Sequence, residues 1–254
     1  MKKSIKLLAL LAMGAALAFA ACGSNSKVEG QGDGAAAAEW VDLGLPSGLL
    51  WAKCNLGATK PEEYGDYYAW GETSTKEVYT WETYKYCTAV DEEGWFKTLS
   101  KYNTISRYGS PDNLTTLQTS DDVATQKLGN GARMPTETEW NELLDNTTSE
   151  WTTENGVYGR RLTASNGKSL FLPAAGYRWG SELYYAGGVG NYWSSSLDAD
   201  DPDNPDNAWV FLFSSDDPDN PDNAWVFLFS SDGQGMSYDF RYGGLSVRPV
   251  RSAR

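Results

Sequence analysis

Residues 120–144 read SDDVATQKLGNGARMPTETEWNELL, and they contain the two helices that the sequence predicts. Ser120 stands at the N-cap of a first helix from Asp121 to Leu128, because a serine hydroxyl accepts hydrogen bonds from the free amides of a first turn. Aspartates at the positive end favour the same start, and Gly129 favours an end directly after Leu128. The first helix is therefore predicted to be short.

The second helix is predicted by a capping box. Thr136 and Glu139 stand at the spacing at which each side chain reaches the backbone amide of the other. Trp140, Leu143 and Leu144 follow as an apolar stripe at helical spacing, which is typical of a helix that packs on a core.

The rest of the chain has the pattern of short strands separated by turns rich in Gly, Asn and Asp. Strands are predicted at Leu49–Ala52, Tyr67–Trp70, Ser169–Leu172, Tyr192–Ser195, Ala208–Phe213 and Leu245–Val250. Two short helices and a mostly antiparallel β remainder with long loops place the chain in the α+β class.

Six short signatures rich in Gly, aromatic residues and Arg-Pro run through the chain. They are Val41–Gly48 (VDLGLPSG), Tyr64–Glu72 (YGDYYAWGE), Ala132–Thr136 (ARMPT), Leu172–Arg178 (LPAAGYR), Tyr192–Ser196 (YWSSS) and Ser246–Arg251 (SVRPVR). In this order the set resembles the Fibrobacter succinogenes major paralogous domain, a family common in lipoproteins of gut Bacteroidota. The resemblance implies a C-type-lectin-like fold, related to formylglycine-generating enzymes and to the variable proteins of diversity-generating retroelements. It implies a surface that binds a ligand, and it does not name the ligand.

The N-terminus has the pattern of a lipoprotein signal peptide at residues 1–21. A basic start precedes an apolar stretch, Leu7–Phe19, that is too short to span a membrane. Residues 19–22, Phe-Ala-Ala-Cys, read as a lipobox with Cys22 as the lipid acceptor, and simple secretion with cleavage after Ala20 is the alternative. Lipidation predicts an outer membrane lipoprotein, either periplasmic or on the cell surface.

Residues 22–38 are small and polar with no apolar periodicity, which is typical of a flexible tether. Residues 39–254 are long enough to form one domain with one core. The only contact expected with a membrane is the lipid anchor.

Charge and composition exclude several function classes. The net charge is −13 and becomes more negative when the leader's lysines are removed, so nucleic acid and anionic lipid surfaces are excluded as partners. The chain contains no histidine, which excludes Ser-His and Cys-His catalysis and histidine-bound metals.

Three cysteines limit the covalent chemistry. With Cys22 lipidated, Cys54 and Cys87 remain as an even pair in an oxidising compartment and predict a disulfide bond. Two separate buried thiols are the alternative. The formylglycine-generating enzymes are understood to use a cysteine pair late in the domain, whereas no cysteine follows Cys87 here. Their oxidase chemistry is therefore not expected.

A perfect tandem repeat interrupts the C-terminal half. Residues 200–215, DDPDNPDNAWVFLFSS, recur without change as residues 216–231. Each copy joins an acidic Pro-Asn loop to a strand that is apolar on both faces, as expected of a buried strand. The family pattern has room for one copy between residues 193–196 and 246–249. A recent duplication and an artefact of sequence assembly both explain the second copy.

The two acidic loops, Asp201–Asn207 and Asp217–Asn223, offer the oxygen ligands that calcium prefers. They lack the glycine and the terminal glutamate of an EF-hand loop, so a rigid solvated turn is the favoured interpretation and no cofactor is expected. No pair of carboxylates is distinguished as a glycosidase site.

Two irregular stretches have the composition of an adaptable binding surface, in which rigid aromatic side chains alternate with small polar ones. The predicted ligand-binding residues are Trp179, Tyr184, Tyr185, Asn191, Tyr238, Arg241 and Tyr242. In the variable proteins that the chain resembles, this C-terminal region faces the ligand. Aromatic residues packed on the domain are the alternative. Arg133 and Arg248, next to the family's prolines, are assigned to structure.

These observations predict a lipid-anchored cell-envelope protein that displays a non-catalytic binding surface for a protein or a glycan. A carbohydrate-binding module is the first alternative, and exposed coplanar rings in a groove would support it. A carboxylate-based hydrolase is the second, and a cleft with two suitably spaced carboxylates would support that.

Overall fold

The computed structural model describes residues 38–91, 97–197, 207–211 and 233–253 of the chain. The chain divides into two units, residues 1–35 and 36–254, and every described residue belongs to the second unit. The predicted leader, Cys22 and nearly all of the predicted tether lie outside the described residues. None of the helices in the described part has the length and apolarity needed to cross a bilayer.

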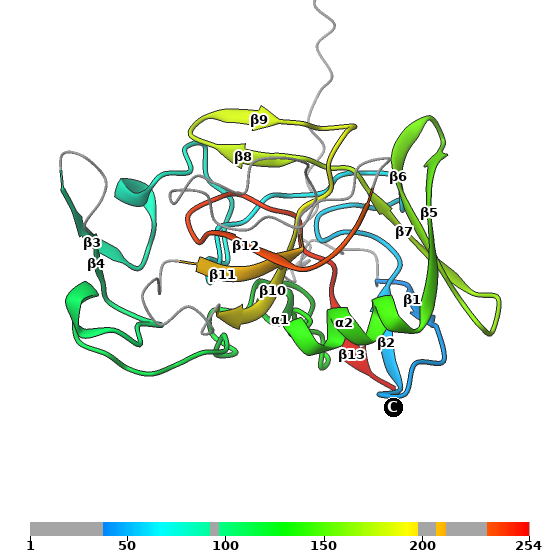
Figure 1. Ribbon diagram of the computed structural model, residues 1–254, viewed down its shortest axis with the longest axis horizontal. Helices are drawn as coiled ribbons and strands as arrows, with labels where there is room; N and C mark the ends of the chain where they lie inside the picture. Colours follow the sequence, from blue (N-terminus) through cyan, green and yellow to red (C-terminus); the bar gives the residue numbers. More distant parts are fainter. Residues whose placement is uncertain (1–37, 92–96, 198–206, 212–232, 254) are drawn as a thin grey trace, which may run out of the picture. The chain divides into compact units, whose positions relative to one another are not determined.

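The described part contains short helices and strands joined by long loops (Figure 1). The helices are the 3-10 helices η1 (Trp81–Thr83) and η2 (Ser106–Tyr108) and the α-helices α1 (Val123–Leu128) and α2 (Glu137–Asp145). The strands are β1 (Trp40–Asp42), β2 (Leu49–Ala52), β3 (Cys87–Val90), β4 (Lys97–Leu99), β5 (Thr147–Glu154), β6 (Val157–Ala164), β7 (Ser169–Pro173), β8 (Tyr177–Trp179), β9 (Glu182–Tyr184), β10 (Tyr192–Leu197), β11 (Asn207–Phe211), β12 (Ser237–Phe240) and β13 (Val250–Ser252).

The strands form small antiparallel sheets. The sheet orders are β1-β2-β13, β10-β11-β12, β5-β6-β7, β3-β4 and β8-β9, and every pair is antiparallel. Figure 1 shows β8 and β9 on the side of the unit opposite α1 and α2. The predicted α+β class, with two short helices and a mostly antiparallel β remainder, is confirmed.

The predicted capping box of α2 is confirmed. The Thr136 side chain accepts the amide of Glu139, and the Glu139 carboxylate accepts the amide of Thr136. The predicted start of α1 is wrong, because Asp122 and not Ser120 is the N-cap and accepts the amide of Thr125 at 2.9 Å.

Local turn chemistry explains a hairpin that the strand predictions omit. Strands β5 and β6 pair along their whole length, and Asn155 and Gly156 connect them with φ of 48° and 84°. An Asn-Gly pair favours this left-handed turn because glycine has no side chain to resist a positive φ. In contrast, the predicted strand Tyr67–Trp70 forms only an isolated bridge, between Tyr68 and Leu245.

Two apolar clusters form the core. Trp70 and Trp193 belong to the first, and Trp51 and Trp140 belong to the second, with ring centroids 4.7 Å apart. Trp70, Trp140 and Trp193 each donate the indole N–H to a backbone carbonyl. These large rings therefore fill space and also hold loops that have no strand partner.

The guanidinium of Arg248 is fully buried and uses all of its donors on neutral oxygens. It donates to the carbonyls of Ala52, Lys53 and Phe171 and to the side-chain oxygen of Asn55, at distances of 2.6–3.1 Å. Burial lowers the pKa of Arg248. The structural role predicted for this arginine agrees with these contacts, which tie the C-terminal segment to β2 and β7.

The predicted disulfide bond between Cys54 and Cys87 is absent from the structure. Cys54 follows β2, whereas Cys87 begins β3, and Figure 1 shows these strands at opposite ends of the unit. The thiol of Cys87 instead donates to the carbonyl of Ala89. The even number of cysteines gave no information on the distance between Cys54 and Cys87.

The first copy of the tandem repeat supplies the central strand of a sheet. Strand β11 pairs with β10 on one side and with β12 on the other. Residues 216–231, the second copy, lie outside the described residues. The connections on either side of β11 are residues 198–206 and 212–236. If residues 223–227 formed this strand instead, the short and the long connection would exchange sides and keep their lengths. The entropy of loop closure would therefore not favour either copy.

This symmetry predicts that the two copies can replace one another. Proline removes a ladder donor and is not tolerated in a central strand. Either single variant, Ala208→Pro or Ala224→Pro, should change the free energy of unfolding by only about 0.5 kcal/mol, the range of a surface substitution. The double variant should lose at least about 2 kcal/mol, because neither copy then forms the strand. Urea unfolding measures all three, and an Ala208→Pro variant as unstable as the double variant would contradict the prediction.

Candidate ligand-binding surface

Strands β8 and β9 form a hairpin that is attached to the rest of the unit through its backbone. Tyr177 lies opposite Tyr184, and Trp179 lies opposite Glu182. On the outer side of the hairpin turn, Gly180 exchanges two backbone hydrogen bonds with Tyr79, of 2.8 and 2.9 Å. These hydrogen bonds hold the backbone of the hairpin in place, while several of its side chains remain exposed to solvent.

Exposed apolar side chains concentrate on this hairpin. The large hydrophobic residues that are exposed in the described part of the chain are Val78, Tyr158, Trp179, Leu183, Tyr184 and Tyr185. All except Tyr158 belong to the hairpin or directly precede its partner Tyr79, and we call these five residues the hairpin patch. Tyr185 has the largest exposed fraction, 65%. Exposed apolar groups that gather in this way mark interaction sites more often than scattered ones do.

The rings of the hairpin patch are tilted against one another. Tyr177 and Tyr184 stack with an interplanar angle of 26°, but Tyr184 and Tyr185 form an angle of 41°. Trp179 packs edge-on against Phe240. The exposed rings of Tyr184 and Tyr185 are therefore not coplanar with each other, in contrast to the platform expected of a carbohydrate-binding module.

Three of the predicted binding residues, Trp179, Tyr184 and Tyr185, are brought together in the hairpin patch. Two others, Asn191 and Tyr242, are buried, so the prediction that they contact a ligand is wrong. The side-chain amide of Asn191 has no hydrogen-bond partner among the described residues.

Arg241 is also fully buried, which contradicts its predicted binding role. Its guanidinium donates to the carbonyls of Lys101 and Tyr102 and to the hydroxyl of Tyr84. It lies 5.1 Å from the centre of the Trp70 ring, within the range of a cation–π contact. The side chain of Tyr238 lies outside the described residues, so the prediction for it stays open.

A cleft of about 480 Å³ lies beside the hairpin. Its lining includes Asp66, Lys76, Glu77, Tyr79 and Arg178. Lys76 is already engaged, because its ammonium is 2.9 Å from a carboxylate oxygen of Glu72. The sequence predictions did not include this cleft, although Arg178 ends one of the six signatures.

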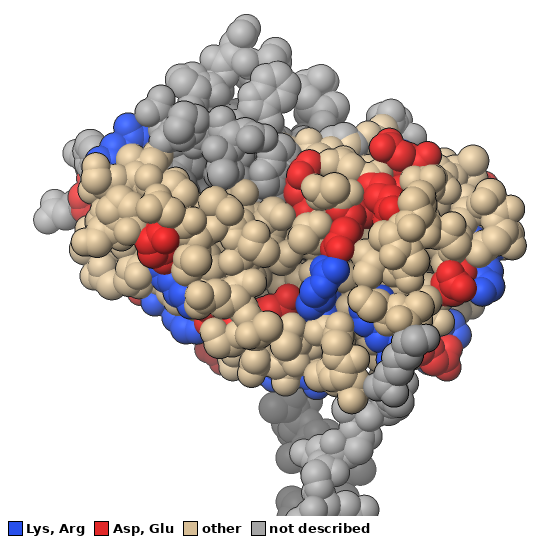
Figure 2. Space-filling model, turned by 90° about the horizontal axis from the view of Figure 1, so that it is seen from below, with Lys and Arg blue, Asp and Glu red and all other residues tan. Residues whose placement is uncertain are grey.

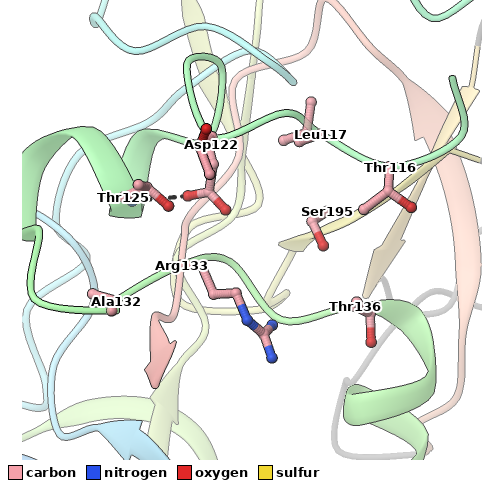
Figure 3. A pocket seen from close by; sticks show the side chains of 10 residues that line it. Thr116, Leu117, Asp122, Thr125, Ala132, Arg133, Thr136 and Ser195 are labelled. Carbon is pink, nitrogen blue, oxygen red and sulfur yellow. Dashed lines mark hydrogen bonds between the residues drawn. The ribbon is translucent and has the colours of Figure 1, made fainter. Parts of the chain in front are cut away.

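A second cavity, of about 350 Å³, lies between α1 and the loop that precedes α2 (Figure 3). Its polar side chains are used internally. Asp122 accepts backbone amides from Thr125 and Met134, and Arg133 forms a two-pronged ion pair with Glu139. Burial raises the pKa of Asp122, and these amide hydrogen bonds oppose the rise. The arrangement explains why these residues stabilise the helix starts, and it agrees with the structural role predicted for Arg133.

Acidic and basic side chains also meet on the outside of the unit. Figure 2 shows the side where α1 and α2 lie, on which Asp and Glu gather near the middle next to Lys and Arg. No group of three or more His, Cys, Asp or Glu in the described ranges is arranged to hold a metal ion. The acidic loops considered for calcium, apart from Asn207, lie outside those ranges.

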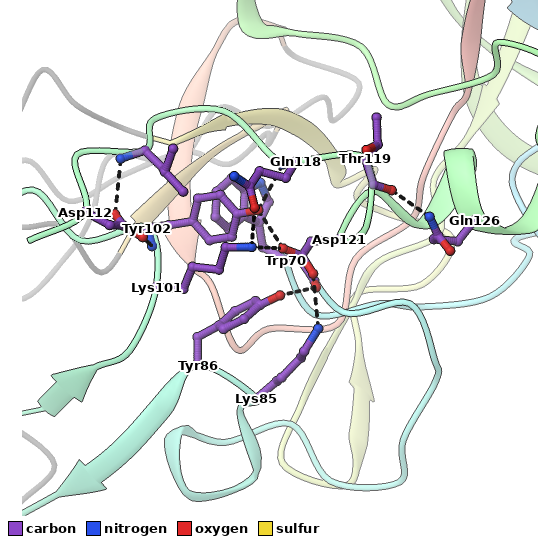
Figure 4. Close-up of polar contacts among 12 residues, drawn as sticks. Trp70, Lys85, Tyr86, Lys101, Tyr102, Asp112, Gln118, Thr119, Asp121 and Gln126 are labelled. Atoms are coloured by element: carbon purple, nitrogen blue, oxygen red, sulfur yellow. Dashed lines mark hydrogen bonds and ion pairs between the residues drawn. The ribbon is translucent and has the colours of Figure 1, made fainter.

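Asp121 is the centre of a buried polar cluster (Figure 4). It accepts hydrogen bonds from Lys101, Tyr102 and Lys85 at 2.5, 2.8 and 3.2 Å, and from Tyr86. Burial alone would raise the pKa of Asp121, but these donors hold it well below its usual value. Asp121 lies directly before the N-cap Asp122 and outside α1, and not in the first turn where the sequence had placed it.

Comparison with known proteins adds no relative to this description. The chain matches no protein-family model, no curated protein and no solved structure. The interpretation of the hairpin patch and of the cleft therefore depends on their geometry.

The Asp121 cluster predicts a specific loss of stability in acid. Because the folded-state pKa is depressed, the contribution is complete above the unfolded value of about 3.9 and is lost as pH falls through the folded pKa. Asp121→Asn should lower the free energy of unfolding at neutral pH by about 2–3 kcal/mol. This value is smaller than for a fully buried ion pair, because Lys85 is half exposed and solvent screens its charge.

Urea unfolding at stepwise lower pH measures this effect. The variant should lose less stability below about pH 4 than the wild-type protein does. Asp145→Asn, at an exposed position at the end of α2, is the matched control and should behave as the wild type. Parallel acid profiles for wild type and Asp121→Asn would contradict the assignment.

Proposed function

We propose that the protein is a non-catalytic binding protein of the cell envelope that contacts a macromolecular ligand through the hairpin patch. One observation carries the proposal: among the described residues, five of the six exposed large hydrophobic side chains lie on or beside one hairpin. Apolar surface that stays exposed to water is unfavourable, and a patch that no partner covers adds nothing to the stability of the fold.

The composition of the hairpin patch suits a polypeptide ligand better than a sugar. Trp179, Tyr184 and Tyr185 are residue types that are enriched at protein interfaces. Val78 and Leu183 add aliphatic surface, and the exposed rings are tilted against one another. The Tyr side chains also lose little conformational entropy on binding, because they have few rotatable bonds.

We further propose a C-type-lectin-like arrangement of the α+β unit. The support comes from the six signatures and from the structural use of their residues. Arg248 of the last signature donates to carbonyls of β2 and β7, and Arg133 of the third pairs with Glu139 of α2. A fold in which buried arginines and aromatic rings organise long loops leaves one hairpin available for display.

The third part of the proposal is a lipid anchor at Cys22. Its support is the apolar segment Leu7–Phe19 followed by the lipobox-like residues 19–22. An anchor at this point, followed by the polar residues 22–38, would hold the binding unit close to a membrane.

The anchor predicts membrane partitioning that depends on one thiol. The wild-type protein expressed in its natural envelope should enter the detergent phase, whereas Cys22→Ala should be released as a soluble form, because acyl chains supply the membrane affinity. Phase separation followed by immunoblotting measures this. A Cys22→Ala variant that stays in the detergent phase would rule out the anchor.

The hairpin patch predicts loss of binding without loss of folding. Purified full-length protein is tested on arrays of envelope and host proteins and of glycans. The double variant Tyr184→Ser/Tyr185→Ser should weaken binding to proteins by at least about tenfold, since exposed aromatic anchors contribute most of the binding energy at interfaces.

Tyr158→Ser is the matched control, because Tyr158 is exposed to a similar extent but lies on β6 and stacks on Trp151. It should bind as the wild type does, and all three proteins should share one thermal midpoint. Undiminished binding by the double variant, or signals on glycans alone, would refute the assignment of the patch to a protein ligand.

A further inference from the structure

The cleft beside the hairpin contains an arginine whose backbone is fixed and whose charged group forms no hydrogen bond or ion pair with the described residues. Arg178 lies in β8 opposite Leu183 of β9. On its other side it exchanges two backbone hydrogen bonds with Gly244, of 2.8 and 3.0 Å. Any side chain at Gly244 would collide with the Tyr79 ring, since a Cβ there would lie 2.6 Å from it. Close packing of Tyr79 on this backbone therefore fixes the position from which Arg178 extends.

The guanidinium of Arg178 is half-buried and lies over the ring of Tyr67, 5.3 Å from its centre. Among the described residues, no side-chain hydrogen bond or ion pair of Arg178 is formed. The buried arginines of this unit differ sharply, because Arg241 and Arg248 donate to several oxygens each. A guanidinium has five N–H donors, so Arg178 retains its capacity to bind an acceptor.

Two charged neighbours of Arg178 in the cleft, Lys76 and Asp66, have other partners. Lys76 pairs with Glu72 and donates to the carbonyl of Thr83, at 2.9 and 3.1 Å. Asp66 accepts the hydroxyl of Tyr68 at 2.9 Å. Arg178 therefore keeps more free donors toward a ligand than Lys76, the other cation of the cleft lining, and its contact with the Tyr67 ring helps to orient its planar group.

The charge of Arg178 and its apolar neighbours indicate which chemical group of a ligand would bind here. A planar guanidinium matches the two oxygens of a carboxylate. Asp66 and Glu77 also line the cleft and would repel a doubly charged phosphate more than a singly charged carboxylate. Opposite residues of a hairpin share one face, so the exposed side chain of Leu183 lies on the same face as Arg178.

We infer that Arg178 binds a carboxylate of the polypeptide ligand, from an acidic side chain or a C-terminus, while a neighbouring apolar group of that ligand contacts Leu183 of the hairpin patch. The inference rests on the proposed function and adds to it the chemical group that the cleft selects. Arg178 is then a specificity-determining residue, because the apolar patch alone does not distinguish a carboxylate from an amide.

The test uses the full-length protein and two small probes that differ in one group, N-acetylphenylalanine and N-acetylphenylalaninamide, in NMR titrations at millimolar concentration. The wild type should bind the acid about tenfold more tightly than the amide, the difference expected for one charge-assisted bidentate contact. Arg178→Gln should bind both probes equally. Arg161→Gln, at an arginine of β6 that pairs with Glu154, should retain the preference.

Each remaining outcome is decisive. Equal affinity of the wild type for acid and amide, no binding of either probe, an acid preference that survives in Arg178→Gln, or stronger binding of inorganic phosphate would overturn the inference. Tyr184→Ser/Tyr185→Ser distinguishes the two proposals. If that variant loses binding on the protein arrays while the wild type shows no acid preference for the probes, the hairpin patch is a binding surface and the role of Arg178 is refuted. Thermal unfolding checks that Arg178→Gln stays folded, as expected for a side chain with no hydrogen bonds to lose.

Discussion

A buried guanidinium without a carboxylate partner is the constraint on which much of this structure depends. Arg248 has left water completely, so every one of its donors must find an acceptor within the protein. The carbonyls that it uses come from the end of β2, from the loop after it and from β7. Removal of Arg248 would leave these carbonyls without donors, and removal of any of the segments would leave a buried charge unsatisfied. Through these contacts the segment that leads into β13 is tied to the end of β2 and to β7.

The same solution recurs in the first core cluster. Arg241 donates to carbonyls of the loop at residues 101–102 and lies against the ring of Trp70. Nearby, Asp121 collects donors from two lysines and from tyrosine hydroxyls. Long loops have many backbone groups that no strand satisfies. Arg241 satisfies two of these carbonyls, whereas Asp121 joins loops through their side chains. The consequence for function is that most polar and aromatic residues of the C-terminal region are committed to folding.

Local signals predicted local structure well. The capping box of α2, the apolar strand at Leu49–Ala52 and the exposed aromatic residues around Trp179 depend on neighbours in sequence or on composition, and the structure has them as expected. The Asn155-Gly156 turn is a signal of the same kind, and it would have located β5 and β6.

Contacts between distant segments were not predictable in this way. Arg241 resembles a surface arginine in its sequence context, and only its contacts with Tyr84 and Tyr102, more than a hundred residues earlier, show that it is buried. The spacing of Cys54 and Cys87 did not report that β2 and β3 lie at opposite ends of the unit. The sequence did not indicate Arg178 as a site residue, because its capacity to bind depends on hydrogen bonds that its side chain does not form with the described residues.

The central claim is a division of roles, in which the buried arginines and rings hold the loops and the β8–β9 hairpin is left to bind. Nitration of the native full-length protein with tetranitromethane, followed by mass spectrometry of each tyrosine, tests it most directly. The account predicts fast modification of Tyr184 and Tyr185, and modification of Tyr84 and Tyr242 only after unfolding. Nitration of Tyr242 in the native protein as fast as that of Tyr185 would contradict it.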